Sequence, residues 1–284
     1  MDGLASQERV GAEREAGAAE ATVAAPTPAI VPALFLSDIH LGSPHCQAAS
    51  LTRFLDLFQP RRLYLVGDFI DVWRLQRLWY WNPDYQVLLD KLGEYANWGT
   101  QFYYTPGNHD ECLRPHEFDL GGMQIADEFV HETQDGRRLL IIHGDRFDVV
   151  EQYAWWISFI SCRVHDKIHG VAKATEDQQQ SLPSTRGPFD RTSKWLVRVI
   201  SRYERRSARY AAKKNCMGVV CGHVHRPKLR ALGDVLYANA GDWVESMSAL
   251  VEQPSGELQL IRVPGVAAWQ DHGEPFELSL VDKS

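Results

Sequence analysis

The sequence predicts a single α/β domain in which apolar β-strands alternate with amphipathic helices. Three observations carry this prediction: five short apolar runs each end in a polar motif, helical periodicity fills the first gaps, and the first four motifs are 30 to 40 residues apart. That spacing accommodates a strand, a helix and a turn, as in sheets with crossover connections. Continuous apolar runs are typical of strands that are buried on both faces.

The first elements can be placed in chain order from these patterns. The five runs are residues 33–36, 63–66, 102–104, 139–142 and 218–221. Between the first two runs, apolar residues recur at helical spacing from Leu51 to Phe58, which predicts a helix over residues 47–58. Before the third run, Asn82 is suited to cap a helix and Pro83 to occupy its first position, so a second helix is expected there.

The pattern changes after the fourth run. Residues 151–214 are expected to form a helical insertion that is interrupted by a polar loop at residues 175–188. Strands are expected to return at residues 235–238, 248–251 and 258–261. The simplest organisation is a disordered leader at residues 1–29, a catalytic domain at residues 30–265 that contains the insertion, and a tail at residues 266–284 without a clear pattern.

Composition excludes several classes of protein. The formal net charge of −7 argues against general nucleic-acid binding, so no nucleic-acid partner is expected. Five scattered cysteines without CxxC spacing favour neither a disulfide framework nor a cysteine zinc site, and they suit a reducing compartment. No segment approaches the roughly 18–20 apolar residues of a membrane span, and the leader lacks the features of a signal peptide. We therefore expect a cytoplasmic protein.

Each apolar run is followed by a short motif of acidic, amide or histidine residues. The motifs are SDIH at residues 37–40, GDFID at 67–71, GNHD at 107–110, HGD at 143–145 and GHVH at 222–225. Because ligands bind at the carboxyl ends of strands in α/β sheets, all five motifs are expected to converge at one edge. Any one of them alone is more often a turn or a structural histidine, but five in series predict a shared metal site.

The donor types in these motifs indicate which metals they would hold. The predicted ligands are Asp38, His40, Asp68, Asn108, His143, His223 and His225. Oxygen and nitrogen donors without a thiolate suit a pair of ions such as Mn²⁺, Fe or Mg²⁺, with Zn²⁺ as an alternative. Asp68 is the natural bridge because a carboxylate can offer one oxygen to each ion. Two ions roughly 3.5–4 Å apart would acidify a water molecule and clamp phosphoryl oxygens.

The residues beside the predicted ligands suggest how a proton would move. His109 follows the ligand Asn108 and is predicted to act as a general acid, with Asp110 orienting it. Asp71 and Asp145 are expected to support the ligand histidines from behind rather than to bind metal. The motifs together therefore predict metal-assisted cleavage of a phosphoester.

The motif set resembles that of the calcineurin-like metallophosphoesterases over residues 34–263. The resemblance implies a two-sheet αββα sandwich, and it implies that His109 is catalytic. It further implies two metal ions that share Asp68. One ion would be held by Asp38, His40, Asp68 and His225, and the other by Asp68, Asn108, His143 and His223.

A closer resemblance is to the UDP-2,3-diacylglucosamine pyrophosphatase group. It rests on residues 37–42, 67–74 and 239–246, which read SDIHLG, GDFIDVWR and NAGDWVES. It implies hydrolysis of a nucleotide-linked lipid precursor to UMP and an acylated sugar phosphate, peripheral to an inner membrane. The best-known enzymes of the group carry arginine where this sequence has His109. That departure leaves open a general phosphodiesterase or phosphatase that acts on a soluble phosphoester.

The insertion and a nearby loop hold candidate substrate contacts. The aromatic residues between 151 and 170 predict either a helix that faces the core or a lid that receives acyl chains. The basic residues between 194 and 214 predict either a solvated helix face or a contact with anionic lipid. Arg74 and Arg77 could contact phosphate, and surface solvation is the alternative explanation.

Overall fold

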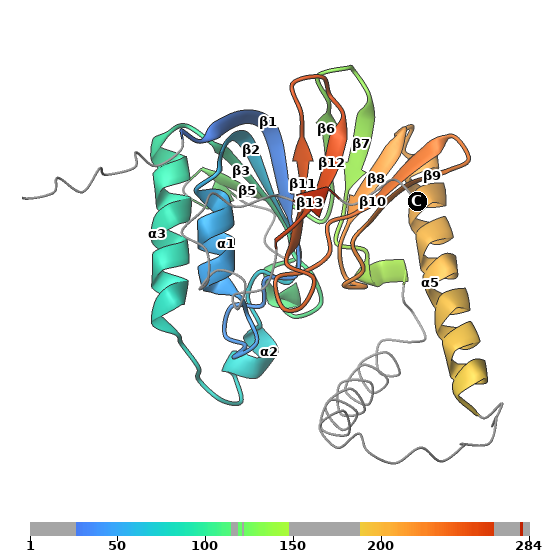
Figure 1. Ribbon diagram of the computed structural model, residues 1–284, viewed down its shortest axis with the longest axis horizontal. Helices are drawn as coiled ribbons and strands as arrows, with labels where there is room; N and C mark the ends of the chain where they lie inside the picture. Colours follow the sequence, from blue (N-terminus) through green and yellow to red (C-terminus); the bar gives the residue numbers. More distant parts are fainter. Residues whose placement is uncertain (1–26, 115–118, 121, 148–187, 264–278, 281–284) are drawn as a thin grey trace, which may run out of the picture.

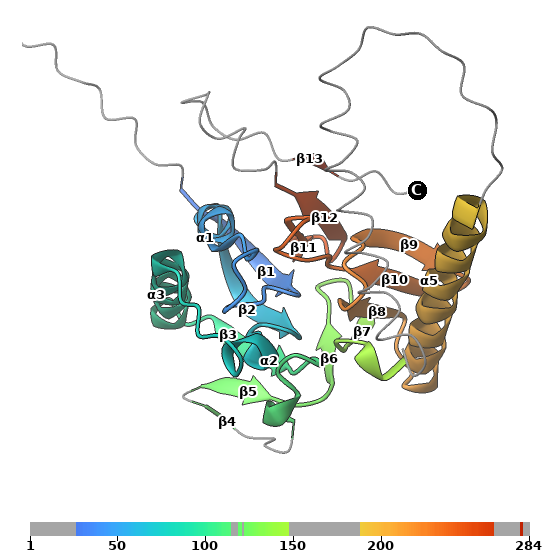
Figure 2. The same ribbon diagram turned by 90° about the horizontal axis from the view of Figure 1, so that it is seen from below.

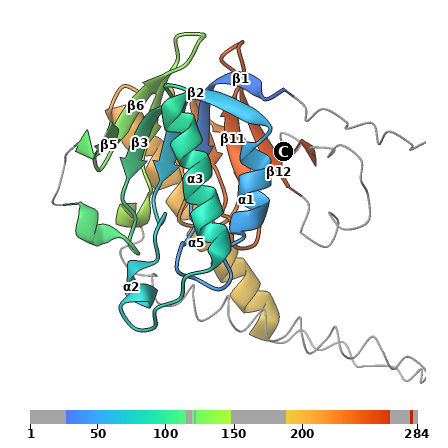
Figure 3. The same cartoon turned by 90° about the vertical axis from the view of Figure 1, so that its left-hand side faces the viewer.

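The computed structural model describes residues 27–114, 119–120, 122–147, 188–263 and 279–280, and it has four layers. Two β-sheets pack against each other, with helices on both outer faces (Figure 1). Helices α1 (Ala48–Leu55) and α3 (Pro83–Asn97) lie side by side over the first sheet (Figure 3), and α5 (Pro188–Lys213) covers the second. The αββα sandwich that the sequence resemblance implied is therefore confirmed.

The first sheet has eight strands in the order β13-β12-β11-β1-β2-β3-β5-β4. Strands β1, β2, β3 and β5 run parallel, whereas β11, β12 and β13 pair antiparallel beyond β1, and β4 pairs antiparallel with β5. Their bounds are β1 (Ala29–Leu36), β2 (Phe58–Val66), β3 (Gln101–Thr105), β4 (Asp119–Leu120), β5 (Met123–Ile125), β11 (Ser248–Glu252), β12 (Leu258–Arg262) and β13 (Ser279–Leu280).

The second sheet has five strands in the order β6-β7-β8-β10-β9. The central strands β7 (Arg138–Ile141), β8 (Gly218–Cys221) and β10 (Val235–Asn239) run parallel. The edge strands β6 (Phe129–Glu132) and β9 (Lys228–Leu232) are antiparallel to their neighbours. Because β7 and β8 are parallel, the chain must cross over between them, and α5 lies on that crossover.

All five apolar runs form strands, and several element boundaries differ from the prediction. Helix α1 ends at Leu55 because Phe58 already begins β2 and pairs with Ala29. Ala29, expected to close the leader, is the first residue of β1. Asn82 caps α3 as predicted, since its side-chain oxygen accepts from the main-chain N–H of Asp84 at 3.0 Å.

Several elements of the structure were not predicted from the sequence patterns. Helix α5 begins at residue 188, earlier than the basic segment indicated, and β13 lies in the tail. Strands β4, β5, β6 and β9 were also not predicted. Residues 151–187, including the proposed aromatic lid, lie outside the described residues, as do most of the leader and the tail. Among the described residues, no helix is long and apolar enough to cross a bilayer.

The central strands are buried on both faces, as their continuous apolar sequences predicted. In β1, Leu34 and Leu36 pack with the helices, whereas Ala33 and Phe35 pack with the second sheet. Side chains in a strand alternate between its two faces, so one run of apolar residues supplies both interfaces. A third apolar cluster joins α5 to the outer face of the second sheet through residues such as Tyr203.

A buried polar contact also joins the two sheets. His131 in β6 lies between Tyr64 and Arg62 of β2 and Glu252 of β11. Arg62 can only donate, so Nδ1 of His131 accepts from it at 3.3 Å, and Nε2–H donates to Glu252 at 2.9 Å. The second carboxylate oxygen of Glu252 accepts from the main-chain N–H of Gln134 at 2.7 Å. Glu252 thus satisfies two donors at the seam.

Glu252→Ala should lower the free energy of unfolding by roughly 2–6 kcal/mol, because it leaves two buried donors without an acceptor and each costs about 1–3 kcal/mol. Urea denaturation would measure the loss. Glu252→Gln keeps one acceptor oxygen and should be less destabilised. An alanine variant as stable as the parent protein would show that the contact contributes nothing to joining the sheets.

Candidate dinuclear metal centre

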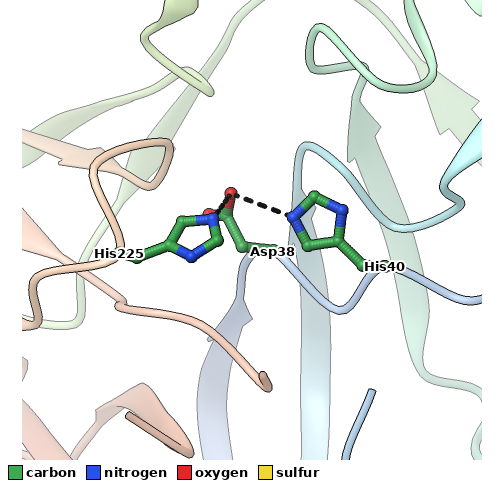
Figure 4. Close-up of side chains that lie close together, drawn as sticks. All are labelled: Asp38, His40 and His225. Carbon is green, nitrogen blue, oxygen red and sulfur yellow. Dashed lines mark ion pairs between the residues drawn. The ribbon is translucent and has the colours of Figure 1, made fainter. Parts of the chain in front are cut away.

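The five motifs meet where strands from both sheets end. Asp38 and Asp68 follow β1 and β2 of the first sheet, and His225 follows β8 of the second. The Nε2 of His225 lies 3.1 Å from Oδ1 of Asp38, which joins the first and last motifs across the seam between the sheets (Figure 4). The predicted convergence at one edge is therefore observed.

The backbone at the predicted ligands is unusual. In the described part of the chain, seven residues other than glycine have positive φ, and five of them are predicted ligands. These five are Asp38 at 52°, His40 at 55°, Asp68 at 52°, His223 at 68° and His225 at 46°. A left-handed conformation costs roughly 1–2 kcal/mol for a residue with a Cβ. Strain of this kind concentrates at functional sites, where the surrounding structure holds it in place.

One cluster of candidate ligands consists of Asp38, His40 and His225, whose ligand atoms all lie within 4.8 Å of one another. Figure 4 shows both imidazole rings directed at the Asp38 carboxylate, with His40 Nε2 at 3.8 Å from Oδ1. The second carboxylate oxygen accepts from the main-chain N–H of His223 at 2.9 Å. Asp38 is therefore held in place by the fifth motif.

A second cluster consists of Asp38, Asp68 and His143. Nε2 of His143 lies 3.4 Å from Oδ2 of Asp68, and the same oxygen lies 3.9 Å from Nε2 of His40. Nδ1 of His143 is 3.0 Å from the carbonyl oxygen of Val66, to which it can donate. That bond turns the lone pair of Nε2 toward the site, as is usual for a metal-binding histidine. Asp68 thus lies between ligands from both clusters.

Two buried atoms fit a metal pair because each offers a lone pair. His40 Nε2 and Asn108 Oδ1 have no hydrogen-bond partner among the described residues. Buried polar atoms are normally satisfied, so such a group at one site needs an explanation. His223 adds a ring whose centroid lies 5.2 Å from that of His143. The residues present therefore suit two divalent cations.

The electrostatics of the site favour cations. Burial alone would raise the pKa of Asp38 and Asp68, but the neighbouring histidines lower it, to about 2 for Asp38 and well below the ordinary range for Asp68. Burial lowers the pKa of His40 to about 4, which keeps its ring neutral. Burial also lowers the pKa of His225, but Asp38 outweighs it and brings the value to about 9. A bound cation would displace that proton, as metals do from imidazole ligands.

His109 is paired with Asp71, whereas the sequence assigned its orientation to Asp110. Nδ1 of His109 lies 3.0 Å from Oδ1 of Asp71, and the Trp73 ring lies against its imidazole with centroids 4.8 Å apart. Burial lowers the pKa of His109, but the bond to Asp71 and the charge of Asp68 raise it above its ordinary value. The main-chain N–H of His109 donates to Asp68 at 2.8 Å, which ties the backbone of His109 to the ligand cluster.

Asp110 instead connects the backbone of the second and third motifs. Its carboxylate accepts from the main-chain N–H groups of Phe69 at 2.8 Å and Gly107 at 2.5 Å, and from the hydroxyl of Tyr104. Burial and the charge of Asp68 raise the pKa of Asp110 to about 6. The expectation that it orients His109 is corrected: its hydrogen bonds are those of a residue that shapes the loops.

The remaining predicted residues lie around the rim. Arg74 is half-buried in α2 (Val72–Leu75) and Arg77 is exposed just beyond it, and neither is in the metal clusters. Asp145 forms an ion pair at 2.7 Å with Arg114, which also donates to the carbonyl of Pro106 at 3.0 Å. Arg114 was not identified from the sequence, because no motif spacing distinguishes it from a surface arginine.

The class of protein now follows from the comparison with known families. The sequence model of the calcineurin-like phosphoesterase family matches residues 31–227, a span that contains all five motifs. This chain therefore belongs to the calcineurin-like phosphoesterase family, whose members use divalent metals, and it is a hydrolase.

Similar curated proteins have a more particular name. A protein of Aeromonas salmonicida named UDP-2,3-diacylglucosamine hydrolase is 27% identical over 252 residues, which cover 80% of this chain and 91% of the relative. A Haemophilus influenzae protein of the same name is 22% identical and covers 80% of this chain and 98% of its own length. The chain thus spans nearly the full length of both relatives.

Solved structures with similar folds are more distant. Vacuolar protein sorting 29 from Cryptosporidium parvum aligns with a TM-score of 0.43 and 12% identity, covering 88% of this chain and 97% of that chain. Yfce, a phosphoesterase from E. coli, aligns with a TM-score of 0.41 and 16% identity, covering 81% and 91%.

Gly107 lies so close to the predicted ligands that a side chain there should disrupt the site. A Cβ at this position would lie 2.2 Å from Asp68 Oδ1 and 2.7 Å from His143 Nε2. Gly107→Ala should therefore lower metal content and abolish most hydrolysis, as measured by elemental analysis and phosphodiester turnover. Gly93→Ala in α3 is the matched control, because its Cβ meets nothing within 4 Å. Full metal content in the Gly107 variant would contradict this account.

Proposed function

We propose that this protein uses two divalent cations, with Mn²⁺ as the leading candidate, to hydrolyse the pyrophosphate bond of UDP-2,3-diacylglucosamine or a similar nucleotide-diphospho-lipid. The products would be UMP and an acylated sugar phosphate. The observation that supports the proposal is that five of the seven predicted ligands, Asp38, His40, Asp68, His143 and His225, form two buried clusters that share Asp38. The substrate is suggested by relatives that match about 80% of the chain and bear the corresponding hydrolase name.

The proposed ligand sets are those that the family resemblance implies. Asp38, His40, Asp68 and His225 would hold one ion, and Asp68, Asn108, His143 and His223 would hold the other. When bound, two such ions supply Lewis acidity that activates water and neutralises charge on the phosphoryl oxygens. Fe, Mg²⁺ and Zn²⁺ also suit this set of oxygen and nitrogen donors.

His109 would donate a proton to the leaving group. The Asp71 carboxylate accepts from Nδ1–H, so Nε2 is the nitrogen that would serve a substrate oxygen. The raised pKa keeps the ring protonated more of the time, which suits a group that donates a proton. Arg74 and Arg77, on the rim beside Asp71, would contact the phosphates of the substrate.

His109 also supports a second candidate function. The best-known enzymes of the resembled pyrophosphatase group have arginine here, and a histidine beside the metal ligand is the pattern of general phosphoesterases. A metal-dependent phosphodiesterase or phosphatase that acts on a soluble phosphoester would use the same cluster and the same Asp71–His109 pair. The two functions differ in substrate and share their chemistry.

Two substitutions should separate metal binding from proton transfer. Asp68→Ala should remove at least one ion and abolish turnover, because it deletes the bridging carboxylate. His109→Ala should keep both ions and lose about 10²–10⁴-fold in kcat. Elemental analysis beside steady-state kinetics measures both effects. A fully active His109 variant with two ions would exclude the general-acid role.

Asp71→Asn should lower kcat with little change in metal content, because an amide cannot stabilise the imidazolium of His109 as a carboxylate does. If Asp71 acts through His109, the double variant with His109→Ala should be no slower than His109→Ala alone. Kinetics of the two single variants and the double variant test this. Fully additive losses would show that Asp71 acts independently of His109.

Product analysis decides the substrate. After incubation of UDP-2,3-diacylglucosamine with the enzyme and Mn²⁺, mass spectrometry should detect UMP and the acylated sugar phosphate in equal amounts. Absence of UMP, together with rapid hydrolysis of a generic soluble phosphodiester, would favour the second candidate function. The Asp68→Ala variant is the control for hydrolysis that does not depend on the metal site.

A further inference from the structure

An unusual concentration of exposed apolar side chains lies in residues 73–81, which we name the aromatic segment. Of nine large apolar side chains exposed among the described residues, four lie in this short stretch. The exposed fractions are 43% for Trp73, 67% for Leu78, 72% for Trp79 and 38% for Trp81. A contiguous apolar patch of this kind on a protein surface usually marks an interaction site.

The patch is held together by its own ring contacts. The rings of Trp79 and Trp81 are stacked, with centroids 5.9 Å apart and an interplanar angle of 17°. Trp81 in turn meets the ring of Tyr85 edge-on at 5.3 Å, and Tyr85 is fully buried in α3. The exposed indoles are therefore supported by the core rather than carried on an isolated loop.

The aromatic segment lies at the rim of the metal centre. It begins within α2 and continues into the connection to α3, and Figures 1 and 3 both show this connection projecting beyond the ends of the strands. Its first residue, Trp73, lies against the imidazole of His109. A partner surface that binds the aromatic segment would therefore lie next to the metal centre, where the phosphate group of the substrate reacts.

The charge of the aromatic segment is positive although the protein is acidic. No acidic residue occurs between Asp71 and Asp84, and the charges within that span are those of Arg74 and Arg77. Tryptophan combined with arginine is the composition that suits a membrane interface, where indole rings lie at the level of the headgroups. Basic side chains near an anionic leaflet are attracted to its phosphates.

We propose that the aromatic segment docks on an anionic lipid bilayer, with Leu78, Trp79 and Trp81 in the headgroup region and the two arginines against lipid phosphates. Its use in catalysis rests on the proposed function, since a lipid-linked substrate would reach the metal centre without fully leaving the membrane. The docking surface thus belongs to the catalytic domain itself.

The arginine face of α5 is the competing surface for anionic lipid. Arg198, Arg202, Arg205 and Arg209 are exposed at helical spacing on the outer side of the second sheet. Figure 2 shows α5 well separated from α2. Residues 198–213, whose side chains the structure describes, expose no large apolar group there. The described part of this face could attract lipid headgroups, but it has no exposed large apolar side chain to insert among them.

Co-sedimentation with vesicles tests the proposal on the full-length protein. Vesicles of phosphatidylcholine and phosphatidylglycerol at about three to one should bind the parent protein, with weaker binding as salt screens the charges. Leu78→Ser/Trp79→Ser should lower the partition coefficient by about tenfold or more, because two apolar side chains no longer leave water. Both side chains are exposed, so the variant should fold normally.

The control variants show which surface of the protein binds the vesicles. Trp98→Ser removes another exposed indole, at 44%, just beyond the opposite end of α3, and should bind like the parent protein. Equal binding by the parent and the Leu78/Trp79 variant would overturn the proposal. So would loss of binding in an Arg202→Ala/Arg205→Ala/Arg209→Ala variant alone, which would assign docking to α5.

Activity measurements separate this proposal from the proposed function. The Leu78/Trp79 variant should hydrolyse a soluble phosphodiester like the parent protein, while its activity on vesicle-embedded UDP-2,3-diacylglucosamine falls. If the parent protein binds vesicles through the aromatic segment yet releases no UMP, the docking surface stands and the lipid-linked substrate is wrong. If UMP is released but no vesicles are bound, the docking proposal is wrong.

Discussion

The carboxylate of Asp68 is the group on which the arrangement of the site depends. It follows the central strand β2, lies within 4 Å of His40 and His143, and accepts the main-chain N–H of His109. Residues from the first, third and fourth motifs are thus positioned against one side chain. Its pKa lies well below the ordinary range because the surrounding imidazoles outweigh burial, so it is fully ionised. Removing this charge would leave a cluster of histidines without a common counterion.

The site is built at the seam of two sheets, and this ties catalysis to the packing between them. Asp38 belongs to the first sheet and His225 to the second, and their 3.1 Å contact crosses the seam. The contact of His131 with Glu252 crosses the same seam between β6 and β11. The apolar cluster around Phe35 and Ile141 fills the space between the sheets. A small sliding of one sheet over the other would therefore alter the distances between ligands.

The sequence was sufficient to predict the strands that the ligand motifs follow, because each motif is local and lies just after a buried strand. It could not decide which carboxylate meets His109: Asp110 is adjacent in sequence, yet Asp71 reaches the imidazole across a turn. Arg114 was missed because its partner Asp145 is brought to it only by the tertiary fold. Local patterns predict where chemistry lies, whereas the pairing of neighbouring acids depends on loop geometry.

The left-handed backbone of the ligand residues has a consequence for how this centre can change. Five of the predicted ligands hold positive φ, a conformation that asparagine, aspartate and glycine adopt more readily than branched side chains. Replacing one of these aspartates or histidines by glycine would relieve strain while deleting a donor. Relief of local strain therefore favours loss of the metal centre, whereas function and the hydrogen bonds that Asp38 and Asp68 accept oppose it. Strengthening the fold and retaining the centre are conflicting demands at these positions.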